Sequence, residues 1–246
     1  MNTLVCISTT PETTAKIAFS SDGTSYNSEG VNYIMNPYDE WYALVRAIEI
    51  KEADGGEVHV IHVGPGSSDI IIRKALAIGA DAAYRVDTEA VEAYQVAAEI
   101  AAFAKGRDYQ IIFTGKETID HNGAEVAGLL AGMLDLPFVS FANDLKLDGS
   151  TATVGREIEG GTEVVSVELP VVISAAKGLA EQRIANMRGI MMAKRKPLEV
   201  LQPTAASAKV KVSKFELPPV KSGVTMVDPD NMKELVRLLA EEAKAL

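Results

Sequence analysis

Apolar runs and helix-like spacings alternate along the first half of the chain. Short apolar runs predict four strands, at residues 4–7, 58–63, 83–86 and 110–114. Four helices are expected, at residues 36–48, 67–78, 91–104 and 126–134. Apolar residues at helical spacing indicate the first and the fourth, a serine cap the second, and a high alanine content the third. The fourth strand is almost wholly apolar, as expected for a parallel strand covered on both faces. The alternation predicts an α/β fold, with an open, mostly parallel sheet and helices on both of its faces.

Polar residues indicate where these helices should begin. Asn36 is expected to cap the first helix, with the proline after it at the first helical position. Ser67 or Ser68 can cap the second helix. Before the fourth helix, Asp120 or Asn122 can act as a cap, or the same residues can belong to a ligand-binding loop.

After about residue 143 the pattern becomes that of an antiparallel sheet. The stretches 145–147 and 151–154 flank Asp148-Gly149-Ser150, which predicts a hairpin. Residues 163–169 alternate apolar and polar side chains, which predicts a further strand. An antiparallel extension beside the parallel sheet is therefore expected.

The C-terminal part predicts an arm and a terminal helix. A short helix is expected at 184–193, and residues 197–220 hold four of the ten prolines, which indicates an extended chain. Asp228-Pro229 would open a last helix with one apolar face, packed either on a partner or on the chain's own core. Two domains are expected, an α/β domain at 1–196 and an arm with a helix at 197–246.

Composition narrows the classes of function. The chain has 246 residues, of which 24 are basic and 34 acidic, and its net charge of −10 argues against nucleic acid or an anionic membrane as partner. It lacks the roughly 20 continuous apolar residues of a transmembrane helix and a basic, apolar leader, so a cytoplasmic location is expected. Cys6 is the single cysteine, and with three histidines it shows no metal-ligand spacing. No catalytic constellation is recognisable, so we expect a binding or carrier protein and not an enzyme.

One loop carries the main signal for ligand binding, because it joins the fourth strand to the fourth helix. Its residues are Gly115, Lys116, Glu117, Thr118, Ile119, Asp120, His121, Asn122, Gly123, Ala124, Glu125 and Val126. Ligands of open parallel sheets bind at the carboxyl ends of strands, and a helix N-terminus offers free N–H groups to a phosphate. The loop matches neither the phosphate loop of common NTPases nor the dinucleotide fingerprint. The residues alone leave a structural loop and a nucleotide loop equally open.

Four sequence blocks resemble the beta subunits of electron transfer flavoproteins. The longest runs from Val154 to Ser174 and contains Arg156-Glu157-Ile158-Glu159-Gly160-Gly161, followed after a strand by Leu169-Pro170. The other blocks occur in family order, at 35–40, 72–81 and 183–197. Because the blocks span nearly the whole chain, the resemblance implies a nucleotide-binding α/β domain that pairs with an alpha subunit.

This resemblance implies an electron carrier. It would take electrons from dehydrogenases, such as the acyl-CoA dehydrogenases of fatty acid β-oxidation, and pass them to a membrane-associated quinone oxidoreductase. The alpha subunit would hold the redox-active FAD, and residues 197–246 would dock on that subunit. The chain would bind a structural AMP and would have no catalytic side chain of its own. The alternatives are an electron-bifurcating member with a second FAD in the same site, and a stand-alone nucleotide-sensing protein.

By position, the resemblance implies two sites. The nucleotide site would combine the loop from Gly115 to Val126 with Cys6, Asn36, Pro37, Tyr38, Asp39, Val63, Gly64 and Pro65. Tyr38 would also face the flavin of the partner. The docking segment for dehydrogenases would be Ile184, Ala185, Asn186, Met187, Arg188, Gly189, Ile190 and Met191. Met187 would replace the family's usual leucine as a flexible apolar anchor.

The nucleotide loop departs from the family pattern at three positions. Glu117 and Glu125 stand where glutamine is usual, and Asn122 stands where aspartate is usual. A carboxylate beside a phosphate is repulsive unless it meets a ribose hydroxyl or a backbone N–H, and Glu125 could do either. AMP is favoured over FAD for this site.

Overall fold

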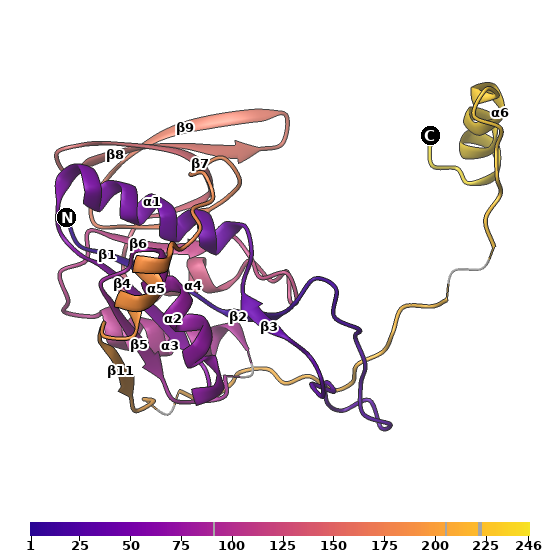
Figure 1. The fold of residues 1–246 in the computed structure, drawn as a ribbon. Coiled ribbons are helices and arrows are strands. Elements are labelled where there is room, and N and C mark those ends of the chain that lie inside the picture. The colour runs from indigo at the N-terminus through magenta and orange to yellow at the C-terminus, as the bar shows by residue number, and fades with distance from the viewer. Residues whose placement is uncertain (91, 205, 221–222) are drawn as a thin grey trace.

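One sheet forms the frame of the molecule. The computed structural model describes residues 1–246 except 91, 205 and 221–222. In the described residues, the sheet strands are β1 (Thr3–Cys6), β4 (Val58–Val63), β5 (Ala82–Val86), β6 (Ile111–Gly115), β7 (Phe138–Asp148), β8 (Thr151–Ile158), β9 (Gly161–Glu168), β10 (Val171–Ala175) and β11 (Leu198–Leu201). Their order is β11-β5-β4-β1-β6-β10-β7-β8-β9 (Figure 1).

The sheet confirms the predicted fold class. All neighbours from β11 to β7 are parallel, whereas β7, β8 and β9 pair antiparallel. The first four predicted strands agree with β1, β4, β5 and β6 to within one residue. The hairpin predicted at Asp148-Gly149-Ser150 joins β7 to β8.

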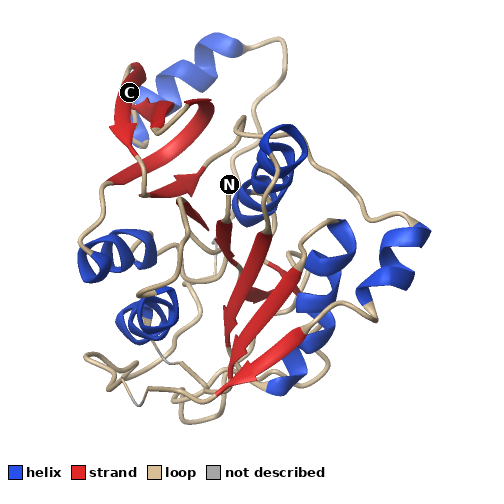
Figure 2. Cartoon of the chain, turned by 90° about the vertical axis from the view of Figure 1, so that its left-hand side faces the viewer, coloured by secondary structure: helices blue, strands red, loops and turns tan. Residues whose placement is uncertain are grey.

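Helices cover both faces of this sheet (Figure 2). α1 (Asp39–Asp54) and α2 (Asp69–Ile78) share one apolar core with Val5 and Phe113. α3 (Ala93–Ala104) and α4 (Val126–Leu134) share the other core with Leu4 and Ile112, because successive strand residues point to opposite faces. None of the helices in the described part of the chain has both the length and the apolar character needed to cross a bilayer.

Several helix starts differ from the predicted ones. α1 begins at Asp39 and not at Asn36, whose side chain makes no cap hydrogen bond to this helix. α2 follows a 3-10 turn, and Ser68 precedes it without a side-chain cap. α3 was expected from Val91, which lies outside the described residues, and Glu92 caps this helix by accepting from two backbone N–H groups.

Asparagines cap the two C-terminal helices. α5 (Met187–Ala193) is shorter than the predicted helix because the Asn186 side chain caps it by accepting from the Gly189 N–H at 2.8 Å. α6 (Met232–Arg237) is capped by Asn231, so Asp228-Pro229 precedes the helix and does not open it.

Three strand features were not predicted from the sequence. β10 lies in the sheet between β6 and β7, and its five residues are all buried. β11 pairs with β5 at the sheet edge, so the first residues of the expected arm belong to the sheet. β2 (Thr9–Pro11) and β3 (Tyr33–Met35) form a separate antiparallel pair.

The segment after β11 is tied to α3 by a buried carboxylate. Glu99 is 2% exposed and accepts hydrogen bonds from the backbone N–H and the hydroxyl of Thr204 at 2.8 and 2.9 Å. Further along, Phe215 stacks on Phe19 with ring centroids 4.9 Å apart. α6 stands apart from the sheet and buries none of its residues, and the chain ends near it (Figure 1).

Candidate functional site

The candidate site lies where the order of the sheet reverses. From β1 the chain first builds β4 and β5 on one side, and then returns to place β6 on the other side of β1. The carboxyl ends of β1 and β6 therefore border the crevice at which open α/β sheets bind their ligands. The predicted loop Gly115–Val126 leaves β6 at this point and leads into α4.

A buried carboxamide joins the two segments that border this crevice. The Asn36 side chain donates to the Glu117 carbonyl and accepts from the Ile119 N–H, both at 3.0 Å. Its own backbone N–H donates to the Ser8 carbonyl at 3.0 Å. Asn36 has no exposed surface, so its side of these bonds is shielded from water. Asn36 thus connects the end of β1 and the start of α1 to the loop after β6.

A close backbone approach brings the loop against α1. A Cβ atom at Gly115 would lie 2.9 Å from the Glu40 side chain and 3.2 Å from that of Asp39. The Glu40 carboxylate accepts hydrogen bonds from the Ser8 N–H at 2.7 Å and from the Ser8 hydroxyl at 2.6 Å. Only glycine leaves room for this contact, which explains why β6 ends in a glycine.

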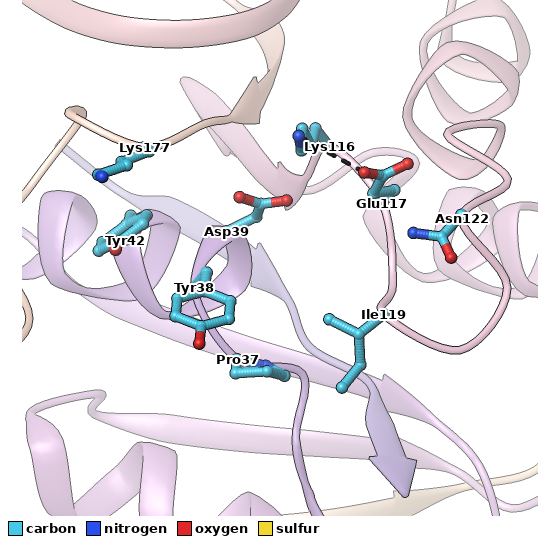
Figure 3. A pocket seen from close by; sticks show the side chains of 9 residues that line it. All are labelled: Pro37, Tyr38, Asp39, Tyr42, Lys116, Glu117, Ile119, Asn122 and Lys177. Atoms are coloured by element: carbon cyan, nitrogen blue, oxygen red, sulfur yellow. Dashed lines mark ion pairs between the residues drawn. The ribbon is translucent and has the colours of Figure 1, made fainter. Parts of the chain in front are cut away.

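A cavity of about 260 Å³ opens between these segments (Figure 3). It is lined by Pro37, Tyr38, Asp39, Tyr42, Lys116, Glu117, Ile119, Asn122 and Lys177. Two carboxylates and two ammonium groups contribute, so the charges of the lining side chains balance. Lys116 approaches Glu117, with 3.4 Å between Nζ and Oε1. Lys116 and Lys177 are thus the cationic groups that the cavity presents to a ligand.

The structure brings together part of the predicted nucleotide site. The predicted residues that line the cavity come from the start of α1 and from the loop. Asn36 does not line the cavity, but its side chain bonds the loop. Cys6, Val63, Gly64 and Pro65 do not line it. Cys6 is buried, and burial raises the pKa of its thiol, so it acts as a small apolar residue in the core.

Four residues of this region were not among the predicted nucleotide-site residues, namely Ser8, Glu40, Tyr42 and Lys177. Ser8 directly follows the first strand, and Glu40 closes the block 35–40, so both positions carried a signal. Lys177 follows β10, which was not predicted, and Tyr42 lies one turn into α1. Their contribution to the cavity depends on packing that the sequence pattern does not reveal.

Burial changes the charge of the acids beside the cavity. It raises the pKa of Glu40 to about 8, against the opposing effect of the Ser8 hydrogen bonds. It also raises the pKa of Asp39 to about 6, while Lys116 acts in the opposite direction. Glu40 is therefore largely protonated at neutral pH, which lowers the negative charge that an anionic ligand would meet.

The N-terminus of α4 is open towards the loop. Glu125 precedes the helix but its side chain makes no cap hydrogen bond, and neither Asp120 nor Asn122 occupies the cap position. Asn122 and Ala124 both have positive φ values, of 49° and 52°. In the part of the chain that the structure describes, the first N–H groups of α4 thus have no side-chain cap. No group of three or more metal-ligating side chains occurs among the described residues.

The predicted docking segment forms an apolar surface around α5. Ile184 is 81% exposed and Met187 is 74% exposed, and Ile190 and Met191 of α5 are exposed as well. Trp41 donates to the Arg183 carbonyl at 2.9 Å, which anchors the start of this segment on α1. An exposed, flexible and apolar surface of this kind is typical of adaptable binding sites.

Backbone contacts hold α5 against α2. Arg73 donates to the carbonyls of Ala193 and Lys196 at 2.7 Å, and Lys196 donates in return to the Leu76 carbonyl at 3.0 Å. A Cβ at Gly189 would lie 2.3 Å from the Ala77 carbonyl oxygen, so only glycine permits this approach. The exposed side chains of α5 therefore project from a fixed helix.

Comparisons with known proteins agree with this architecture. Residues 24–206 match the family described as "Electron transfer flavoprotein domain". The chain is 33% identical over 260 residues to "Electron transfer flavoprotein subunit beta" of Bacillus subtilis (strain 168), with 100% of both chains covered. It is 37% identical over 231 residues to the protein of that name from Syntrophomonas wolfei, covering 93% of this chain and 90% of the relative. The Homo sapiens protein of that name is 33% identical over 251 residues, covering 98% and 97%.

Replacing Asn36 tests the link between α1 and the loop. Asn36→Ala leaves the partly buried Glu117 carbonyl and Ile119 N–H without their partner, so we expect a loss of about 1–3 kcal/mol in unfolding free energy. Backbone amide hydrogen exchange should become faster at 116–125, and by more than in β6. Asn32→Ala, a change at an exposed position, should stay within about 0.5 kcal/mol of the parent. Unchanged exchange in the loop of the Asn36 variant would contradict the assigned role.

Replacing Glu40 tests its raised pKa. Because folding raises this pKa from 4.5 to about 8, the carboxyl group stabilises the fold at low pH, and this contribution is lost as the pH rises through that window. The slope is at most about 1.4 kcal/mol per pH unit. Glu40→Gln keeps the shape of the protonated group and should flatten the pH dependence of denaturant midpoints between pH 5 and 8. Glu49→Gln on the same helix serves as the control, and equal slopes in all three proteins would refute the assignment.

Proposed function

The chain belongs to the family of electron transfer flavoprotein beta subunits, and on this premise we propose that it binds AMP in the cavity beside Asn36. The observation that carries the proposal is the pair of hydrogen bonds from the Asn36 side chain to the Gly115–Val126 loop. They fix this loop at the carboxyl end of β6, at the reversal of strand order. The site is thus preorganised at the position where α/β sheets of this type bind nucleotides.

The size of the cavity supports a mononucleotide. Its volume of about 260 Å³ lies just below the roughly 300–1,000 Å³ of pockets for drug-sized ligands. AMP is half of a dinucleotide such as FAD and is the better match for so small a space. A structural ligand of this kind would stabilise the folded chain by mass action.

The charges of the site also support a phosphate group. Lys116 and Lys177 line the cavity, and α4 presents uncapped N–H groups beyond it. Glu117 is paired with Lys116, so its carboxylate does not stand alone against the ligand. Glu125 is exposed and can turn towards a ribose hydroxyl. The two glutamates that depart from the family pattern are therefore compatible with binding.

We assign residues after β11 to contact with the alpha subunit, which would hold the redox-active FAD. The arm carries several apolar side chains that are more than half exposed, namely Val210, Leu217, Val220, Val224 and Met226. Water-exposed apolar residues in such number favour burial against another chain. Tyr38 is 61% exposed at the edge of the cavity and would face the flavin of that subunit.

The proposed role is that of an electron carrier without a catalytic side chain of its own. The flavin supplies the redox chemistry, while this chain binds, orients and docks. The surface of α5 and residues 184–186 would bind dehydrogenases such as acyl-CoA dehydrogenases. The proposed acceptor of the electrons is a quinone oxidoreductase. The proposed location of the protein is the cytoplasm.

Nucleotide analysis of the purified complex tests the proposal. The chain is co-expressed with its alpha subunit, the complex is denatured, and AMP and FAD are quantified by chromatography with mass detection. One AMP and one FAD per heterodimer are expected. The Asn36→Ala complex should lose AMP and retain FAD, which would place AMP in this chain.

Other outcomes would identify the alternatives. Two FAD and no AMP would replace the proposal with an electron-bifurcating protein that carries a second FAD in the cavity. A stable monomer that binds nucleotide and forms no complex with an alpha subunit would indicate a nucleotide-sensing protein.

Replacing Met187 tests the docking surface. Met187→Ala removes an exposed apolar side chain from α5, so the rate of flavin reduction by a dehydrogenase should fall roughly tenfold at subsaturating concentration. AMP content and heterodimer assembly should not change. Val164→Ala, at an exposed apolar residue of β9, is the matched control. Equal reduction rates for the parent and both variants would remove Met187 from this role.

A further inference from the structure

The candidate nucleotide loop contains a chemically labile pair of residues. Asn122-Gly123 is the only Asn-Gly dipeptide among the 246 residues of the sequence. Both residues are exposed, and Asn122 has a left-handed backbone with φ of 49°. The Asn122 side chain lines the cavity (Figure 3). Asparagine is among the thermolabile residues of proteins, and its neighbours decide how readily it reacts.

The geometry leaves the reacting groups unrestrained. Within the described residues, neither the Asn122 carboxamide nor the Gly123 N–H takes part in a hydrogen bond, and the backbone N–H of Asn122 donates to the Thr118 carbonyl at 2.9 Å. A Cβ at Gly123 would have Glu125 Oε1, at 3.8 Å, as its nearest neighbour, so the space around this residue is open. Glycine also gives the peptide the conformational freedom that ring closure requires.

Another exposed asparagine provides an internal reference. Asn27 precedes Ser28, and its Oδ1 accepts a hydrogen bond from the Glu29 N–H at 3.0 Å. This bond holds the carboxamide of Asn27, and the following serine carries a side chain that hinders approach of its nitrogen. Asn27 should therefore react more slowly than Asn122, although both are exposed.

We propose that Asn122 deamidates spontaneously and that this reaction weakens anion binding at the cavity. The Gly123 backbone nitrogen attacks the carboxamide carbon of Asn122 and loses its proton as the new C–N bond forms. The bond to the amide nitrogen breaks and ammonia leaves, which gives a five-membered succinimide. Water then opens the ring at either carbonyl and gives aspartate or isoaspartate. No oxidant or further reactant is needed.

The product changes the electrostatics of the cavity. The charged side chains that line it are Asp39, Glu117, Lys116 and Lys177, which balance. A carboxylate at position 122 adds one negative charge and makes the lining net negative. Asp120 and Glu125 lie on the same loop, so the potential that meets a phosphate becomes less favourable. Isoaspartate also adds a carbon to the backbone of the loop.

Ligand and modification should oppose each other. This consequence rests on the proposed function, because it requires a nucleotide in the cavity. A bound nucleotide would confine the Asn122 side chain and slow its reaction with Gly123. The modified loop would then bind the nucleotide less tightly. Chains that lose their nucleotide would therefore become less able to rebind it with time.

Peptide mapping tests the modification itself. The full chain in complex with its alpha subunit, freed of AMP beforehand, is incubated at mildly alkaline pH, and liquid chromatography with mass spectrometry separates the Asn, Asp and isoAsp peptides of positions 122 and 27. Asn122 should convert at least about tenfold faster than Asn27. Gly123→Ala, whose added Cβ meets only ordinary contacts, should slow conversion to the rate of Asn27. Conversion of Asn27 before Asn122, or unchanged conversion in Gly123→Ala, would overturn the proposal.

Binding measurements test the consequence separately. Calorimetry with AMP compares the AMP-free complex of the parent chain with the complexes of Asn122→Asp and of Asn122→Gln, which stays neutral and whose longer side chain disfavours the five-membered ring. The aspartate variant should bind AMP roughly five- to tenfold more weakly than the glutamine variant. Equal affinity of the two variants would overturn the effect on binding. Absence of AMP binding by all three proteins would refute the proposed nucleotide, while the peptide map would still decide whether Asn122 reacts.

Discussion

The buried carboxamide of Asn36 is the contact on which the geometry of the site depends. Its side chain bonds one donor and one acceptor of the loop after β6, the Ile119 N–H and the Glu117 carbonyl. These two backbone groups are partly buried, so losing the Asn36 partner would cost stability. The same residue joins the end of β1 through its backbone N–H. Three chain segments that are distant in sequence thus keep a fixed spacing around the cavity.

The proposed anion site lies in an acidic chain, with a net charge of −10. Its negative charges are neutralised locally in two different ways. Burial keeps Glu40 largely protonated at neutral pH. Glu117 is instead paired with the neighbouring Lys116. The overall charge of a protein therefore says little about the potential inside a particular crevice, which depends on burial and on the nearest partners.

The sequence predicted the parts of the fold that depend on local pattern. Apolar runs located β1, β4, β5 and β6 to within one residue, because a strand covered on both faces must be apolar. Cap assignment failed at Asn36, since a side chain that can cap a helix can equally bond a distant loop, and only the tertiary structure decides between these partners. β10 was not predicted because its strand partners are far away in the sequence, and Lys177 was missed with it.

Helix α5 is held by bonds to its backbone and not by the side chains that it exposes. Arg73 bonds carbonyl oxygens at its C-terminal end, and Gly189 allows its close contact with α2. The identity of residues such as Met187 therefore has little influence on whether the helix forms. Evolution can alter the exposed side chains of α5 at small cost in folding, so this surface can diverge among descendants of this chain while the scaffold is conserved.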